Sequence, residues 1–298
     1  MGALTSVGIS KKYGKKNVLN NIDLTLEKGK IYGLIGRNGA GKTTLLSIMS
    51  AQNPTTTGTV ELNGEAIWEN QRALGNICFS REIQIGANGS GVSSMKVKEY
   101  LQTASWYYPH WDKVMADKLV KKFKLDPKKK LADLSKGMLS MVTIIIALAS
   151  KADYTFLDEP VAGLDVVMRE YFYRLLIEEY SDTGRTFVVS THIIEEAADV
   201  FEEIIMIKNG TLLLKENTES LVSRAYRISG LAEEVDAATK GLTVHHVEKN
   251  GRGKSVTVLL AEGEEIDSDY DVTVQSLNLQ NVFVALCGME DEVEKEEE

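Results

Sequence analysis

Cysteine is scarce in this chain of 298 residues, which has only Cys78 and Cys287. Two distant cysteines, each among apolar residues, are too few for a disulfide framework or a zinc site, and they are typical of a reducing cytosol. The longest apolar stretch, 141–149, is far shorter than the roughly 20 residues that span a bilayer. The first residues also lack the apolar core of a signal peptide. We therefore expect any contact with a membrane to be made only through a partner protein.

An excess of positive charge is lacking as well. The formal net charge is −9, which disfavours a general affinity for nucleic acid because phosphate contacts require clustered Lys and Arg. The hydrophobic content of 43% is ordinary for a soluble globular protein with a sizeable core. The length allows one large domain, or a main domain with an appendage.

The stretch IYGLIGRNGAGKTT, at 31–44, contains the pattern GxxxxGK[ST] between an apolar run and an apolar segment with helical spacing. Glycines let the backbone bend so that successive N–H groups point at a polyphosphate. Lys42 places a positive charge at the β- and γ-phosphates, and the Thr43 hydroxyl suits Mg²⁺. This loop predicts a nucleoside triphosphate site. The predicted contacts are Gly36, Arg37, Asn38, Gly39, Ala40, Gly41, Lys42, Thr43 and Thr44.

Two carboxylates, Asp158 and Glu159, follow the apolar strand predicted at 154–157. Open α/β sheets bind their ligands at the carboxyl ends of strands. Asp158 would hold Mg²⁺, and Glu159 would polarise the attacking water or accept its proton. The alternative is a solvated acidic turn, which the phosphate loop makes less favoured. His192 also follows a strand and is placed to contact the γ-phosphate, although a lone histidine is more often structural.

A second anion site is predicted at the start of a helix near Ser135 and Gly137. Ser135 offers a hydroxyl, Gly137 offers an approachable N–H, and the helix dipole lies behind them. The alternative is a simple helix N-cap by Ser135.

Strands alternating with helices over residues 1–221 predict a mostly parallel sheet, with a helical insertion at about 92–150. Strands predicted at 3–9 and 18–26 and a hairpin at 58–64 form an antiparallel β subdomain, with the KKYG segment connecting the first two strands. Residues 222–289 predict a small C-terminal α+β domain, and the acidic residues 290–298 predict a disordered tail. The predicted fold class is therefore α/β, of the P-loop NTPase kind.

Taken in order, the motifs resemble those of the ATP-binding cassette (ABC) ATPases, the nucleotide-binding subunits of ABC transporters. They are the phosphate loop at 36–43, LSKGM at 134–138 for the signature, YTFLDEP at 154–160 for the Walker B strand, AGLD at 162–165 for the D-loop and STH at 190–192 for the H-switch. Tyr13 matches the aromatic residue that stacks on adenine, and its alternative role is that of a strand aromatic. The resemblance covers about residues 1–220.

The resemblance implies a mechanism. Two cassettes form a head-to-tail dimer, identical or related, that sandwiches two ATP molecules, so Ser135 and Gly137 act on the partner's nucleotide. Glu159, His192 and Lys42 would be catalytic, with Thr43 and Asp158 at Mg²⁺. Hydrolysis would reopen the dimer and drive a transmembrane permease from the inner face of the cell membrane.

Two departures from the family pattern stand out. Arg81-Glu82 occupies the place of the Q-loop glutamine, with Gln84 slightly later. A glutamate can replace the amide oxygen on Mg²⁺ whereas an arginine cannot, so Glu82 is the predicted substitute. The signature has Lys136 and Met138 where Gly and Gln are usual.

Two further features bear on the partner. The aromatic cluster 106–111 lies in the helical insertion, which in the family docks the transporter, and packing within the insertion is the alternative. The ending SLNLQNVFVAL resembles the tail that follows the cassette in ABC-2 exporters. We predict the ATPase subunit of an exporter. The alternative is a soluble ABC ATPase acting on ribosomes or DNA, which usually carries two cassettes or a long coiled coil.

We predict that Lys42→Ala abolishes nucleotide affinity, because the variant loses the cation placed at the β- and γ-phosphates. Isothermal titration calorimetry measures this directly, and unchanged ATP binding would contradict the phosphate-loop assignment.

Overall fold

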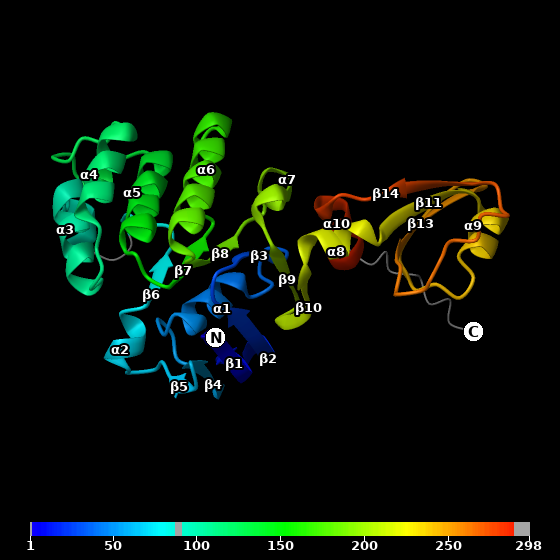
Figure 1. Cartoon of the computed structure of the whole chain (residues 1–298), viewed down its shortest axis with the longest axis horizontal. Coiled ribbons are helices and arrows are strands. Elements are labelled where there is room, and N and C mark those ends of the chain that lie inside the picture. Colours follow the sequence, from blue (N-terminus) through cyan, green and yellow to red (C-terminus); the bar gives the residue numbers. More distant parts are fainter. Residues whose placement is uncertain (1, 87–90, 289–298) are drawn as a thin grey trace. The chain divides into compact units, whose positions relative to one another are not determined.

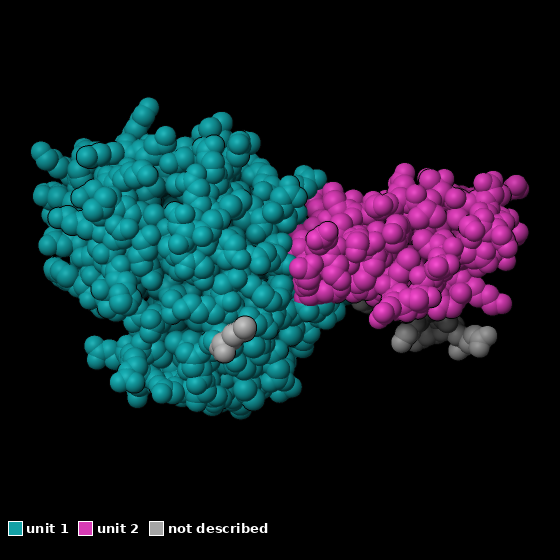
Figure 2. Space-filling view, viewed as in Figure 1, with its two compact units in different colours: residues 1–215 teal, residues 216–298 magenta. Residues whose placement is uncertain are grey.

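The structure is a computed structural model, and it describes residues 2–86 and 91–288. The chain divides into two compact units, residues 1–215 and 216–298 (Figure 2). The domain boundary predicted at 221/222 would instead fall inside helix α8 (Thr218–Ser223). The predicted acidic tail, 290–298, lies outside the described residues.

A six-stranded sheet forms the frame of the first unit (Figure 1). Its order is β10 (Thr211–Asn217), β9 (Glu203–Lys208), β3 (Ile31–Ile35), β8 (Thr186–Ser190), β7 (Tyr154–Asp158) and β6 (Ile77–Ser80). Neighbouring strands from β9 to β6 pair in parallel. The two central strands, β3 and β8, are buried at every residue, as expected for parallel strands covered on both faces. The carboxyl ends of β3, β7 and β8 therefore meet at one edge.

An antiparallel sheet of order β2-β1-β4-β5 accompanies this frame. Its strands are β1 (Ala3–Tyr13), β2 (Lys16–Glu27), β4 (Thr57–Leu62) and β5 (Glu65–Ala66). The prediction that KKYG connects two strands is wrong for its first three residues, because β1 continues to Tyr13 before the chain turns. The strand runs further than its apolar alternation because pairing with β2 reaches the register Tyr13↔Lys16.

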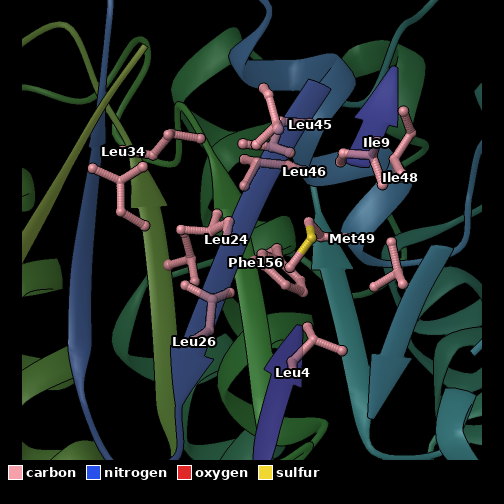
Figure 3. Close-up of a cluster of buried hydrophobic side chains, with 14 of the residues drawn as sticks. Leu4, Ile9, Leu24, Leu26, Leu34, Leu45, Leu46, Ile48, Met49 and Phe156 are labelled. Carbon is pink, nitrogen blue, oxygen red and sulfur yellow. The ribbon is translucent and has the colours of Figure 1, made fainter. Parts of the chain in front are cut away.

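Helix α1 (Lys42–Met49) packs against both sheets and joins them into one hydrophobic core. Its side chains Leu45, Leu46, Ile48 and Met49 lie among those of β1, β2 and β7 (Figure 3). Since α1 begins in the phosphate loop, the same core fixes the position of that loop.

Helices α3 (Val97–Tyr107), α4 (Lys113–Lys122) and α5 (Lys136–Ala149) lie between β6 and β7 in the chain. Asp112 caps α4 and Ser135 caps α5, each side chain accepting a backbone N–H three residues on. The remaining helices of this unit are α2 (Gln71–Leu74), α6 (Val166–Thr183) and α7 (Ile194–Ala197), with 3₁₀ turns at Gly91–Ser94, Leu131–Asp133 and Ala198–Val200.

The second unit is built on an antiparallel sheet of order β12-β13-β11-β14. Its elements are β11 (Ala225–Leu231), α9 (Ala232–Ala238), β12 (Val244–Asn250), β13 (Gly253–Leu259), β14 (Val272–Ser276) and α10 (Leu279–Cys287), after α8. Helix α9 packs on β11 and β13 around a small core of Ile228, Val235, Val256 and Val258.

The predicted fold class is confirmed: a mostly parallel sheet, an antiparallel β sheet, inserted helices and a C-terminal α+β unit are all present. Cys78 and Cys287 are both buried, and no disulfide joins the two. Throughout residues 2–86 and 91–288, no helix combines the length and the apolar character that crossing a bilayer requires.

We predict that Leu46→Ala destabilises the first unit by about 2–5 kcal/mol, because it opens a cavity while keeping a good helix former. Leu46 is 1% exposed. Urea unfolding followed by tryptophan fluorescence reports on this unit, since Trp68, Trp106 and Trp111 all lie in it. The control Val114→Ala, at a side chain 79% exposed, should change stability by less than about 0.5 kcal/mol. Equal effects of the two variants would contradict the core assignment.

Candidate functional site

The phosphate loop runs from the end of β3 into α1, and two of its glycines are required by close packing. Gly41 is the N-cap residue of α1, has φ of 108° and is left-handed, and a Cβ there would lie 2.6 Å from Cδ2 of Leu19. A Cβ on Gly36 would lie 2.6 Å from the carbonyl oxygen of Ile207. Within the described part of the chain, no side chain caps α1. The first N–H groups of the helix are therefore the ones that an anion could bind.

Lys42 is almost completely buried at 8% exposure, and its Nζ donates to the carbonyl oxygen of Gly36 at 2.6 Å. Burial lowers the pKa of this ammonium, while the nearby carboxylates of Glu159 and Asp158 act in the opposite direction. The lysine thus lies within the electrostatic reach of Glu159, the predicted base, and of Asp158, the predicted magnesium ligand. A bound polyphosphate would add negative charge and favour the protonated form further.

The carboxylate of Asp158, at the end of β7, accepts hydrogen bonds from hydroxyl groups of two other elements. Thr43 Oγ1 in α1 donates to Oδ2 at 2.7 Å, and Ser190 Oγ at the end of β8 donates to Oδ1 at 2.5 Å. Both oxygens of the carboxylate are therefore oriented by hydrogen bonds. This arrangement places the Thr43 and Asp158 oxygens side by side, and their role as magnesium ligands stays a prediction.

Glu159 is held in a left-handed backbone conformation with φ of 50°, which is uncommon for a residue with a side chain. Its N–H donates to the carbonyl oxygen of Ser190 at 3.1 Å, and its Oε2 lies 2.7 Å from Nδ1 of His192. This backbone turn directs Glu159 differently from Asp158, although the two are neighbours in the sequence. The carboxylate is thus paired with the histidine at the end of the next strand.

The signature segment packs directly on the D-loop segment, residues 162–165. A Cβ on Gly137 would lie 2.5 Å from the carbonyl oxygen of Gly163, and Ser140 Oγ donates to the carbonyl oxygen of Ala162 at 2.6 Å. Ser135 accepts from the N–H of Met138 at 3.3 Å, which is the N-cap alternative considered for it. Because Ser135 remains exposed, this capping leaves its hydroxyl accessible to a ligand.

Glu82 forms an ion pair with Lys136 at 3.2 Å, and both side chains are about half exposed. The two main departures from the family pattern therefore contact each other. The ion pair gives the Glu82 carboxylate a cationic partner in the signature. The role of Glu82 as a magnesium ligand stays a prediction. Glu82 and Lys136 are far apart in the sequence, so the sequence pattern alone did not predict this ion pair.

Tyr13 is the last residue of β1, so it is an aromatic residue of a strand. Its side chain is also 49% exposed, which leaves the ring accessible to a ligand. The aromatic cluster at 106–111 divides into two parts. Trp106 and Tyr107 are 73% and 74% exposed, whereas Tyr108 and Trp111 stack on each other with centroids 6.4 Å apart.

Ser190 is the residue that the sequence reasoning missed most clearly. It was noted only as part of the STH motif, yet its hydroxyl contacts Asp158 and its carbonyl oxygen contacts Glu159. A polar residue at the carboxyl end of strand β8, directly after three apolar residues, was the available signal.

Comparison with known proteins identifies the family of the chain. A family model described as ABC transporter matches residues 19–162. The lantibiotic transport ATP-binding protein SrtF of Streptococcus pyogenes is 31% identical over 223 residues, which cover 72% of this chain and 93% of SrtF. The chain belongs to the ABC transporter family.

Two further matches extend this result. The ABC transporter ATP-binding protein YtrB of Bacillus subtilis (strain 168) is 24% identical over 94% of this chain and 96% of its own length. The solved structure titled as the dimeric bacterial ABC transporter cassette MJ0796 has a TM-score of 0.62 and 23% identity, covering 72% of this chain and 98% of that one, and it supports the fold.

This ABC protein is therefore an ATP-binding subunit of a transporter and an ATPase. The alternative, an ABC ATPase acting on ribosomes or DNA, is disfavoured because the relatives are transport ATP-binding proteins.

We predict that Ser190→Ala lowers the ATPase turnover number. The variant removes a hydrogen bond to a charged group, worth about 1.5–3 kcal/mol, and a loss of that size in the transition state is about a ten- to hundredfold. Steady-state phosphate release measures the effect. Ser6→Ala, which removes a buried hydroxyl donating to the carbonyl oxygen of Ile22, is the matched control and should retain activity. A Ser190→Ala enzyme as fast as this control would show that the hydrogen bond is not needed.

Proposed function

We propose that this ABC subunit binds ATP with Mg²⁺ at the phosphate loop and hydrolyses it with Glu159 as the base. The observation that carries the proposal is the continuous set of contacts that joins Thr43, Asp158, Ser190, Glu159 and His192. These groups come from the ends of two adjacent parallel strands and from the helix that follows a third. Ligands of open α/β sheets bind at such an edge.

The oxygen atoms of Thr43 and Asp158 suit a magnesium ion. In the described residues, no group of three or more His, Cys, Asp or Glu side chains could hold a metal ion. Mg²⁺ in phosphate-transfer sites uses one or two protein oxygens together with phosphate oxygens and water, so a sparse protein set fits it. ATP would supply the γ-phosphoryl group, and Mg²⁺ held by Thr43 and Asp158 would neutralise the charge that develops on it.

The protein side chains then have separate roles. Lys42 contributes positive charge beside the phosphates, and the N-terminus of α1 contributes N–H donors. Glu159 accepts a proton from the attacking water, and His192 orients that carboxylate through the contact at 2.7 Å. Ser190 fixes the positions of both residues, because its hydroxyl donates to Asp158 and its carbonyl oxygen accepts from the N–H of Glu159.

We further propose that Ser135 and Gly137 complete the nucleotide site of a second ABC subunit in a head-to-tail dimer. Support comes from the exposed Ser135 hydroxyl at the start of α5 and from the dimeric cassette among the structural matches. Gly137 packs on Gly163, and Glu159 lies four residues before Gly163 in the chain. A ligand that displaces the signature would therefore also displace the backbone near Glu159.

We also propose that the subunit acts at the cytoplasmic face of a membrane, bound to a transmembrane permease that exports its substrate. Trp106 and Tyr107 would contribute to the surface that docks the permease, since these large side chains are exposed on the inserted helices. The name of SrtF, a lantibiotic transport ATP-binding protein, supports this transport role.

We predict that Glu159→Gln retains ATP binding, loses turnover and accumulates an ATP-bound dimer. The amide keeps the size of the side chain but cannot accept the proton from water. Size-exclusion chromatography with ATP and Mg²⁺ measures the dimer, and phosphate release measures turnover.

Glu178→Gln, an exposed position on α6, is the control and should behave as the wild type. Wild-type turnover in Glu159→Gln would overturn the assignment of the base. A monomeric, ATP-bound Glu159→Gln protein would overturn the proposed dimer.

A further inference from the structure

Tyr13 is held by a polar cluster that the phosphate site does not use. The cluster consists of Lys11 in the same strand and of Asn53 and Pro54 in the turn that follows α1. The proposal rests on the proposed function, ATP binding at the phosphate loop, and on the family resemblance, which implies that Tyr13 stacks on adenine.

Lys11 is 8% exposed, which is unusual for a lysine, and its ammonium makes two hydrogen bonds. It donates to Oδ1 of Asn53 at 2.8 Å and to the carbonyl oxygen of Pro54 at 2.6 Å. The same ammonium lies 5.0 Å from the centroid of the Tyr13 ring, within the range of a cation–π interaction. One face of the Tyr13 ring is therefore covered by a cation, while about half of the side chain remains exposed.

Asn53 connects the ring to the phosphate loop. Its Nδ2 donates to the hydroxyl of Tyr13, so one amide side chain binds both the ring and the lysine below it. Its backbone N–H donates to the carbonyl oxygen of Ser47 at 3.1 Å, in the last turns of α1. Because α1 begins at Lys42, the aromatic ring and the phosphate loop are tied to one helix.

The strand itself is shaped to bring Lys11 and Tyr13 into this cluster. The pairing of β1 with β2 shifts register between Ile9 and Lys11 and again between Lys11 and Lys12. Such irregularities bend a strand and redirect its side chains. The N–H of Lys12 donates to Oγ1 of Thr56 at 3.0 Å, which attaches the strand end to the same turn.

We propose that Lys11, supported by Asn53, is the positioning residue that sets Tyr13 to receive the purine base of ATP. The cation withdraws electron density from the covered face of the ring, which strengthens stacking of an electron-rich purine on the other face. The fixed ring also loses little conformational freedom on binding, so preorganisation adds to the affinity.

This role separates the affinity for the base from the affinity for the phosphates. Inorganic tripolyphosphate carries the phosphate groups without a base, so it reports on the loop and α1 alone. The ratio of ATP affinity to tripolyphosphate affinity then measures the contribution of the ring and its support.

The experiment uses Lys11→Met in the full chain, which keeps an apolar stem and removes the cation. Loss of a cation–π contact together with the ring's support should weaken ATP binding about three- to tenfold and leave tripolyphosphate binding unchanged. Isothermal titration calorimetry of both ligands with Mg²⁺ gives the ratio. Lys12→Met is the matched control, since Lys12 is exposed, and it should leave both affinities at wild-type values.

A double-mutant cycle shows whether Lys11 acts through the ring. In a Tyr13→Ala background, Lys11→Met should have no further effect on ATP binding. In the otherwise wild-type chain, Lys11→Arg keeps the cation and should therefore keep most of the wild-type ATP affinity. If Lys11→Met folds poorly, Asn53→Ala tests the same support from its other end and should lower the same ratio.

The outcomes are distinguishable. An unchanged ratio in Lys11→Met, with a lowered ratio in Tyr13→Ala, overturns the role of Lys11 and leaves the proposed ATP site intact. An unchanged ratio in Tyr13→Ala overturns base stacking itself, and the inference with it. Equal losses for ATP and tripolyphosphate in Lys11→Met would show a merely structural lysine, which also overturns the proposal.

Discussion

The candidate site depends most on the carboxylate of Asp158, which accepts hydrogen bonds from the hydroxyl groups of Thr43 and Ser190 at 2.7 and 2.5 Å. One donor belongs to the helix after the phosphate loop and the other to the neighbouring parallel strand. The carboxylate therefore fixes three separate segments relative to one another. This is possible because parallel strands place their carboxyl ends on one edge of a sheet, so residues more than a hundred positions apart in the sequence become neighbours.

A second constraint is backbone contact where only glycine fits. Gly41 lies against the carbonyl oxygen of Val18, and Gly137 lies against the carbonyl oxygen of Gly163. The first contact fixes the phosphate loop on the antiparallel sheet, and the second joins the signature helix to the segment after Glu159. Interiors are close-packed, so a displacement at one side of such a contact is passed to the other rather than absorbed. The phosphate loop is thereby connected to β2, and the signature to the segment that follows β7.

Charges near the site are paired in a way that differs from the common family pattern. Glu82, the predicted substitute for the Q-loop amide, contacts Lys136, which stands where glycine is usual, at 3.2 Å. Because both side chains are about half exposed, the pair adds little to stability. Its effect is instead to neutralise a cation and an anion beside the signature. Tyr13 shows a related use of charge, since a buried lysine covers one face of its ring.

The sequence by itself determined the elements and the chemical groups. The alternation of strands and helices, the glycine-rich loop and the carboxylates after β7 follow from local pattern, because side-chain period and turn chemistry are properties of short segments. Only the tertiary structure decided which groups meet. The hydroxyl of Ser190 on Asp158, the pairing of Glu82 with Lys136 and the support of Tyr13 by Lys11 and Asn53 join distant segments. Local pattern cannot specify such contacts, because they depend on strand order, register and packing across the whole unit.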